Sequence, residues 1–219
     1  MGVSAADIKA LRTRTGAGIK DCKTALTESD GDITKAIDWL RAKGIAKAAK
    51  KASRAATEGL CSSYIHAGGK IGVLVEINCE TDFVAKTDDF QNLVRDISMH
   101  IAAAAPEYVS KDEVPADAVE REKQVQIQRV MEEGKPAHIA ERIVMGRMGK
   151  YYEEVCLLEQ KFVKDDSKTV KALLEGAVAT MGENIKVRRF ARFVLGEGLE
   201  KKQDNLAEEV AKMAAQANG

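Results

Sequence analysis

The chain has 219 residues, of which 45% are hydrophobic and 31% are charged, and its formal net charge is zero. This length allows one substantial domain and a small one, and the composition is typical of a globular protein rather than a disordered one. The balanced charge disfavours a uniformly basic nucleic-acid-binding protein. The charge is unevenly distributed, however, because residues 1–54 hold twelve Lys and Arg against six Asp and Glu, a difference of +6. This N-terminal segment is therefore attracted to acidic surfaces.

Cysteine, histidine and hydropathy patterns argue against several kinds of site. The four cysteines have no C-x-x-C spacing, so they are typical of reduced thiols in the cytoplasm rather than of a zinc site or a disulfide framework. The three histidines, His66, His100 and His138, have no second ligand four residues further along the chain, and we expect no metal site. Residues 1–20 lack the apolar core of a signal peptide, and no segment has the roughly 20 apolar residues of a membrane span. We expect a cytoplasmic protein.

Residues 1–55 are predicted to form a small domain of three helices separated by glycine turns. Ser4 and Asp7 have the spacing of a capping box at the start of the first helix. The third helix is predicted to end at Gly44, because glycine commonly terminates helices. The basic stretch 46–56 is interpreted as a solvated linker helix that leads to the next domain.

Residues 56–195 are predicted to form an α+β core with a mainly antiparallel sheet. Residues 71–79 alternate with period two, which indicates a strand with one buried face. Residues 60–66 precede a glycine turn and pair with that strand as a hairpin. The other expected elements of the core are helices near 88–104, 115–133, 136–149 and 169–180 and strands at 152–158 and 184–195. Residues 196–219 are predicted to form a C-terminal helical module.

Phe83 lies where the pattern predicts a loop, between the strand at 71–79 and the next helix. Thr87 has the N-cap position of that helix and is followed by acidic first-turn residues. A phenylalanine in such a loop either folds back to seal the edge of the core or contacts a partner. The residues alone leave both interpretations open.

Five motifs follow one another along the chain. They are Thr-Gly-Ala-Gly at 15–18 with Asp-Cys-Lys at 21–23, the stretch 46–51, Asn-Cys-Glu-Thr-Asp-Phe-Val at 78–84, Gly-Glu-Asn-Ile at 182–185, and Gly-Glu-Gly at 196–198. Together they resemble the elongation factor Ts family, the nucleotide exchange factors of elongation factor Tu. The resemblance implies a ubiquitin-associated-like fold for residues 1–55. It also implies a non-enzymatic guanine nucleotide exchange factor for translation elongation, without a cofactor.

The resemblance also implies which residues contact elongation factor Tu. Phe83 would wedge into an apolar pocket near the magnesium and phosphate site of the partner, together with Thr81, Asp82 and Val84. The other implied contacts are Ile19, Lys20, Lys23, His66, Val163, Lys164, Met181, Leu206, Val210 and Met213.

Each of these further contacts has a structural alternative. His66 is on general grounds a surface histidine, and residues 163–164 fit a connection to a helix capped by Ser167. Met181 belongs to a helix stop, and the apolar stripe of the C-terminal helix fits packing within the chain.

The chain departs from longer family members, which carry two related core subdomains and an inserted coiled coil. One hairpin here has features that those members divide between two subdomains, which implies a homodimer. The alternative function is RNA binding by the basic N-terminal helices and Arg188, Arg189 and Arg192. No aromatic stacking platform accompanies these arginines, and we expect no direct contact with nucleic acid or membrane.

Overall fold

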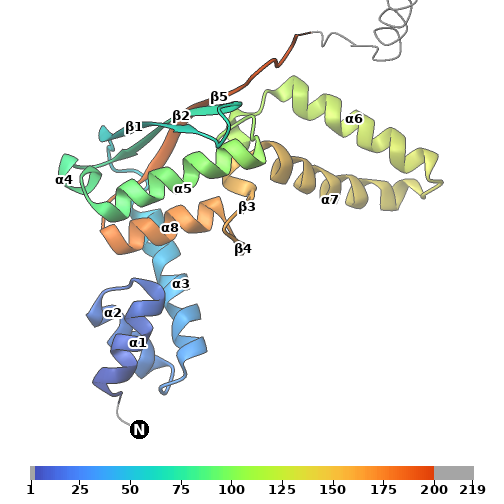
Figure 1. Ribbon diagram of the computed structural model, residues 1–219. Helices are drawn as coiled ribbons and strands as arrows, with labels where there is room; N and C mark the ends of the chain where they lie inside the picture. Colours follow the sequence, from blue (N-terminus) through green and yellow to red (C-terminus); the bar gives the residue numbers. More distant parts are fainter. Residues whose placement is uncertain (1–2, 200–219) are drawn as a thin grey trace, which may run out of the picture.

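The computed structural model describes residues 3–199, apart from the side chains of residues 137 and 138. Three N-terminal helices form a lobe at one end of the molecule, and α3 connects this lobe to a core of helices and an antiparallel sheet (Figure 1). Two further helices project from the other side of the core (Figure 1). The predicted α+β class is confirmed. No helix among these residues is long and apolar enough to cross a membrane.

The N-terminal lobe contains α1 (Ala5–Thr15), α2 (Ile19–Glu28) and the first half of α3 (Ile33–Lys51). The Ser4 hydroxyl accepts a hydrogen bond from the Asp7 backbone N–H, and the Asp7 carboxylate accepts one from the Ser4 N–H, so the predicted capping box is confirmed. The buried residues of this small core are Leu11, Cys22, Ala25, Leu26 and Ala36.

The prediction that the third helix ends at Gly44 is wrong, because α3 continues to Lys51. Gly44 is buried where α3 packs against α8 (Val170–Met181). A Cβ atom at Gly44 would lie 3.4 Å from the Cβ of Ala179, so the glycine permits close approach of the two helices rather than ending one. The expected solvated linker is therefore largely the end of α3, where Ala48 packs against the main core.

The main sheet has the strand order β1-β2-β5 and is antiparallel throughout. Its strands are β1 (Glu58–Ile65), β2 (Ile71–Cys79) and β5 (Lys186–Val194). The predicted buried face of β2 is confirmed, because Val73, Val75, Ile77 and Cys79 are buried. On the other face Leu74 is exposed, but Asn78 is buried and its side-chain amide donates to the Glu58 carbonyl oxygen at 3.1 Å.

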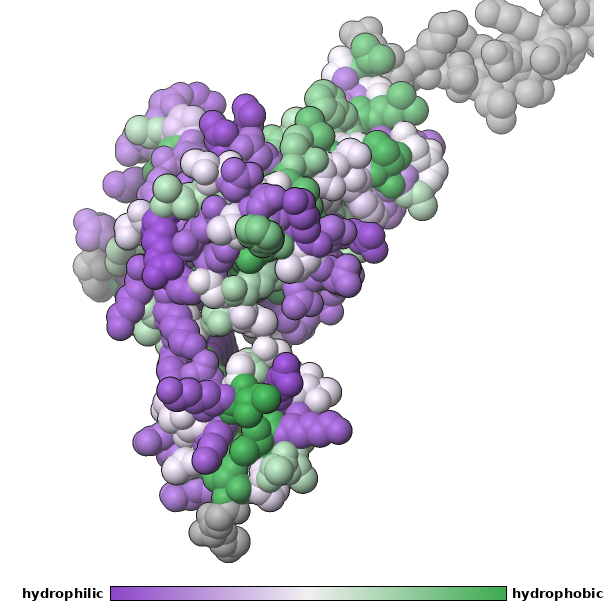
Figure 2. Space-filling model, turned by 90° about the vertical axis from the view of Figure 1, so that its left-hand side faces the viewer, coloured by the Kyte–Doolittle hydropathy of each residue, from purple (hydrophilic) through white to green (hydrophobic). Residues whose placement is uncertain are grey.

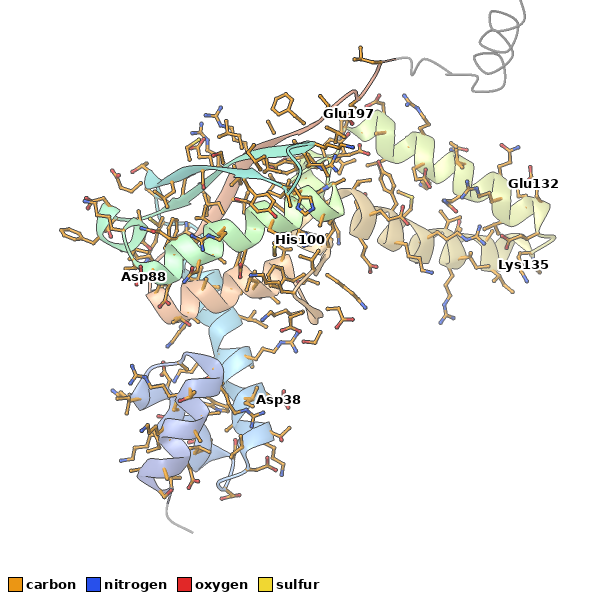
Figure 3. All side chains as sticks on the ribbon, in the orientation of Figure 1. Asp38, Asp88, His100, Glu132, Lys135 and Glu197 are labelled. Atoms are coloured by element: carbon orange, nitrogen blue, oxygen red, sulfur yellow. The ribbon has the colours of Figure 1, made fainter. Side chains whose placement is uncertain are left out.

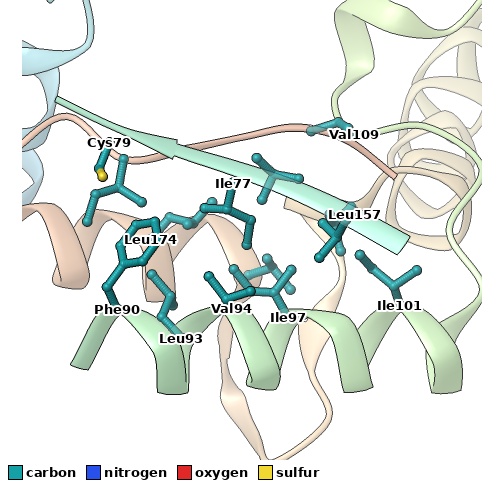
Figure 4. Packing of buried hydrophobic residues seen from close by; sticks show 14 of the residues in the cluster. Ile77, Cys79, Phe90, Leu93, Val94, Ile97, Ile101, Val109, Leu157 and Leu174 are labelled. Carbon is teal, nitrogen blue, oxygen red and sulfur yellow. The ribbon is translucent and has the colours of Figure 1, made fainter. Parts of the chain in front are cut away.

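The inner face of the sheet packs against α5 (Asp88–Ala104) and α8, and the buried side chains interleave between these layers (Figure 4). The Thr87 hydroxyl caps α5 by accepting the Phe90 N–H at 3.3 Å, which confirms the predicted start of this helix. The short helix α4 (Asp82–Ala85) connects β2 to α5.

Helices α6 (Ala116–Glu132) and α7 (Ala137–Val155) run antiparallel as a hairpin away from the core (Figure 1). The predicted strand at 152–158 is wrong. Tyr151 and Val155 are four residues apart, a spacing that fits a helix, and α7 includes both. A 3-10 turn, Leu157–Glu159, then places the Leu157 side chain in the core.

Residues 161–169 form a small hairpin instead of an irregular connection. Its strands are β3 (Lys161–Phe162) and β4 (Asp165–Thr169), and a separate 3-10 turn spans Lys111–Glu113. The expected cap of α8 at Ser167 is wrong, because the Thr169 hydroxyl accepts the Ala172 N–H at 3.2 Å. Ser167 instead donates to the Asp165 carboxylate at 2.6 Å.

Candidate partner-binding site

Phe83 lies on α4, at the end of β2, and its side chain is 80% exposed. The interpretation that this ring seals the edge of the core is therefore wrong. Phe90, one turn into α5, is fully buried and fills the core below. The chain thus presents a large apolar side chain to solvent beside a well-packed core.

The backbone on either side of Phe83 is held by hydrogen bonds. The Thr81 hydroxyl accepts the Val84 N–H at 3.4 Å as the cap of α4, and Ala85 is buried in the core. The buried Cys79 thiol donates to the Thr81 carbonyl oxygen at 3.1 Å, and burial raises the pKa of Cys79, which disfavours the reactive thiolate. These contacts fix the loop and leave the ring itself outside.

Asp82 is exposed next to Phe83 and pairs with Lys86 at 2.6 Å. The hydrogen bond from Lys86 to this carboxylate raises the pKa of the Lys86 ammonium. An exposed ion pair of this kind contributes little to stability. The Asp82 carboxylate therefore remains accessible beside the ring.

Glu183, which follows the C-cap of α8, lies against the start of the Phe83 loop. Its carboxylate accepts hydrogen bonds from the Glu80 N–H at 3.0 Å, the Thr81 N–H at 3.0 Å and the Thr81 hydroxyl at 2.7 Å. In return, the Asn184 N–H donates to the Glu80 carboxylate at 2.7 Å. We call these four bonds the Glu183 clamp.

The sequence alone does not indicate the clamp. Residues 181–184 were interpreted first as a helix stop, and Gly182 with φ 80° at the C-cap of α8 confirms that interpretation. The partners of the clamp are 102 to 104 residues apart along the chain. No local sequence pattern predicts a contact between residues so far apart. The sequence shows only that an acidic residue, Glu183, follows the end of a predicted helix.

The end of α3 is joined to the same region. The Asn184 side-chain amide donates to the carbonyl oxygen of Arg54 at 2.8 Å and weakly to that of Ala52 at 3.4 Å. Lys51 donates to the Gly182 carbonyl oxygen, and Arg54 lies 3.5 Å from the Glu80 carboxylate. The helix that carries the N-terminal lobe thus ends against the residues that hold the Phe83 loop.

The other predicted contact residues are spread over the surface. Ile19 is 59% exposed at the start of α2, and Lys20 and Lys23 are exposed on the same helix. His66 lies at the β1–β2 turn, where its Nδ1 is 3.2 Å from the Tyr64 hydroxyl. Because β2 runs from this turn toward α4, His66 and Phe83 lie at opposite ends of the sheet.

Three further candidates belong to the β3–β4 turn and the end of α8. Val163 is 46% exposed at the turn, and Lys164 beside it pairs with Asp96 of α5 at 2.5 Å. Met181 is half-buried against the main core. The remaining candidates, Leu206, Val210 and Met213, lie outside the described residues.

His100 supports the β3–β4 turn from inside the core (Figure 3). Its Nδ1 accepts the Val163 backbone N–H at 3.2 Å, so Nε2 carries the proton and donates to the Gln160 side-chain oxygen at 2.9 Å. Burial lowers the pKa of His100, in spite of the bond to Gln160. This buried histidine is a neutral structural residue that fixes the position of Val163, a role that the sequence did not indicate.

The lowered pKa of His100 predicts acid sensitivity. The imidazole protonates near pH 6.5 in the unfolded chain but only at lower pH in the folded chain. Its contribution to stability is therefore complete above about pH 6.5 and is lost as the pH falls from there toward the folded pKa. Thermal melting between pH 7.5 and 5 should show a steeper loss of Tm for the wild type than for His100→Gln. Equal slopes for the two proteins would contradict this assignment.

The arginines of β5 bind groups within the chain. Glu76 on β2 accepts hydrogen bonds from Arg188 at 2.9 Å and Arg189 at 2.7 Å, which together lower its pKa. Arg192 donates to the carbonyl oxygen of Ala102 at 3.3 Å. The three arginines offered by the sequence as RNA-binding residues therefore have partners in the sheet and the core.

The described residues contain no group of three or more His, Cys, Asp or Glu side chains placed to hold a metal ion. The features on the surface are instead those of macromolecular contact, namely an exposed ring, exposed aliphatic side chains and a charged helical lobe.

Comparisons with known proteins agree with this arrangement. Residues 45–197 match the family model described as "Elongation factor TS". Two curated relatives named "Elongation factor Ts" show the extent of the similarity. The protein of Anaeromyxobacter sp. (strain Fw109-5) is 62% identical over 212 residues, covering 97% of this chain and 97% of the relative. The protein of Geobacter sulfurreducens is 59% identical over 214 residues, covering 98% and 99%.

The chain is therefore a translation elongation factor. Within that class it belongs to the elongation factor Ts family, as the five sequence motifs indicated.

Proposed function

We propose that this chain is the guanine nucleotide exchange factor of elongation factor Tu and that Phe83 promotes release of GDP. The observation that carries the proposal is the 80% exposure of Phe83 on a loop held by the Glu183 clamp. Exposing such a ring has no benefit for the folded chain alone. It is explained if the ring enters an apolar pocket of a partner.

The expected mechanism is a wedge. Burying the ring supplies roughly 1.5–3 kcal/mol, which offsets displacement of a partner helix near the bound magnesium. Mg²⁺ requires near-octahedral coordination. A small displacement of its ligands therefore weakens the binding of both the ion and the nucleotide to the partner. Thr81, Asp82 and Val84 shape the surface around the ring. The factor accelerates exchange in both directions and leaves the overall GDP/GTP equilibrium unchanged.

The factor and the nucleotide each weaken the binding of the other to elongation factor Tu. If the factor weakens nucleotide affinity by some ratio, the nucleotide weakens factor affinity by the same ratio. The rebinding of a nucleotide therefore promotes release of the factor, and no chemical step is required of the chain itself.

Further contacts would extend along the molecule. We assign residues 1–55, with Ile19, Lys20 and Lys23, to docking on the nucleotide domain, where the net charge of +6 of residues 1–54 assists encounter. Val163, Lys164 and Met181 are further contacts in residues 56–195, and His66 contacts a different part of the partner because it lies at the other end of the sheet. Leu206, Val210 and Met213 represent the module at 196–219. The chain would act in the cytoplasm, where elongation takes place.

We also propose that the outer face of the sheet joins two copies of the chain. The exposed apolar side chains on this side are Ile65, Leu74, Phe193 and Leu195. In Figure 1 the helices within residues 3–199 cover only the inner face, and in Figure 2 hydrophobic surface runs along the upper right of the molecule. These side chains lie on the half of the outer face near the β1–β2 turn, whereas the Glu76–Arg189 ion pair lies on the other half. No described residue covers this apolar half, and it would be buried against its equivalent in a second copy.

The proposal is tested by the release of labelled GDP from purified bacterial elongation factor Tu. The wild-type chain should accelerate release at both low and moderate salt, because an interface centred on Phe83 depends mainly on apolar burial. RNA binding would instead weaken steeply with salt concentration. Absence of acceleration at every factor concentration would refute the exchange function.

A further inference from the structure

We infer that Glu183 is a positioning residue for nucleotide exchange, because it sets the direction in which Phe83 points. This inference rests on the proposed function of Phe83 as a wedge. Glu183 is not itself placed at the interface. It acts through the backbone of residues 80 and 81.

Helix α4 cannot hold its own direction. It has four residues, far fewer than the ~12 that an isolated helix needs to be even marginally stable in water. The exposed Phe83 ring contributes no packing to the core. The orientation of the ring therefore depends on what holds the chain on either side of it. After the ring, Ala85 is buried in the core and Val84 packs against it, which leaves the chain before the ring as the other point of attachment.

Glu183 binds at that point. Its Oε2 accepts the N–H groups of Glu80 and Thr81, each at 3.0 Å, and its Oε1 accepts the Thr81 hydroxyl at 2.7 Å. Hydrogen bonds to an ionised acceptor are stronger than neutral ones. Three of them on two adjacent residues fix both the position and the rotation of the backbone that enters α4.

The clamp is reciprocal, which distinguishes it from a single surface contact. Asn184 donates its N–H to the Glu80 carboxylate at 2.7 Å, while its side chain binds the Arg54 carbonyl oxygen at 2.8 Å. The Phe83 loop, the end of α8 and the end of α3 are therefore held in one network. The network therefore fixes the position of the Phe83 ring relative to the N-terminal lobe, on which the partner is proposed to dock.

Loss of positioning has a different kinetic signature from loss of folded protein. A destabilised factor lowers the concentration of active molecules, so it raises the concentration needed for half-maximal GDP release. A misdirected ring binds the partner through the remaining contacts but lowers the maximal rate at saturation. For Glu183→Ala we expect a maximal rate about 10-fold lower, since a misplacement of the order of 1 Å has effects of that size or larger.

The test measures GDP release from elongation factor Tu against factor concentration, together with Tm, for the wild type and six variants. These are Glu183→Ala, Glu183→Gln, Glu183→Asp, Glu175→Ala, Phe83→Ala and the double variant of Glu183→Ala with Phe83→Ala. Glu183→Gln keeps the side-chain length and one carbonyl oxygen, and it should stay within about 3-fold of the wild-type rate. Glu183→Asp is too short to reach both residues and should resemble Glu183→Ala. If the Glu183→Ala variant does not fold, the rate of Glu183→Asp is used in its place. Glu175→Ala, on α8 and two turns before the clamp, is the control and should leave the rate unchanged.

The double variant combines Glu183→Ala with Phe83→Ala. If Glu183 acts through the ring, this double variant should be no slower than Phe83→Ala alone. Wild-type maximal rates for both Glu183→Ala and Glu183→Asp, or fully additive losses in the double variant, would overturn the inference. A wild-type chain that fails to release GDP refutes the exchange function instead, so the two failures are distinguishable.

Discussion

Replacing Phe83 by alanine is expected to lower the maximal rate of GDP release from elongation factor Tu by about 10- to 100-fold. The ring is 80% exposed and belongs to neither hydrophobic core of the described residues, so its removal subtracts mainly the roughly 1.5–3 kcal/mol that burial in the partner would supply. Stability should hardly change, because no core contact is lost. The measurement is the release of labelled GDP at saturating factor, with Tm recorded on the same samples.

Two further variants sharpen this prediction. Phe83→Leu keeps an apolar side chain of smaller reach and should retain an intermediate rate. Met145→Ala removes a side chain that is 71% exposed on the α6–α7 hairpin, and it should have the wild-type rate. If Phe83→Ala releases GDP as fast as the wild type, the ring is not the wedge.

A carboxylate on the outer face of the sheet is expected to separate the proposed dimer into monomers. Phe193 is 68% exposed on β5, and in a dimer Phe193→Asp would place a charge from each copy in an apolar interface. An unpaired buried charge costs several kcal/mol, which corresponds to a loss of affinity of at least about 10³-fold. Analytical ultracentrifugation should give about twice 23.8 kDa for the wild type and about 23.8 kDa for Phe193→Asp.

Met145→Asp is the matched control, because it adds the same charge at an equally exposed apolar position away from the sheet. It should sediment as the wild type does. The wild-type chain could instead be monomeric at micromolar concentration and still release GDP. That result would contradict the proposal that the outer face of the sheet joins two copies.

Local rules predicted the elements that are stabilised locally. The alternation of residues 71–79 indicated the buried face of β2, and Ser4 and Thr87 marked the starts of α1 and α5 through capping bonds within four residues. The sequence failed where a distant element decides the local structure. Gly44 resembles a helix stop until α8 packs against it. The segment 152–158, which ends in four apolar residues, resembles a strand although its first half continues α7.

The candidate site shows the same division. Phe83 was recognisable because an aromatic residue between a strand and a capped helix is unusual, and the motifs around it pointed to one family. Glu183 and His100 act across more than 60 residues of sequence, through bonds to the backbone of Thr81 and Val163. Residues that support a distant segment in this way show no periodicity or spacing in the sequence, so only the folded structure reveals them.

The continuous helix α3 also has a consequence for affinity. It spans Ile33–Lys51, a length of about 28 Å at 1.5 Å per residue, and joins the N-terminal lobe to the core without a flexible hinge. When two weak contacts are joined by a flexible tether, the tether loses conformational entropy as both contacts form, and this loss weakens binding. A helical connection has already met most of that entropic cost during folding. The second contact therefore forms at a high effective concentration, and each contact can remain weak enough for rapid dissociation.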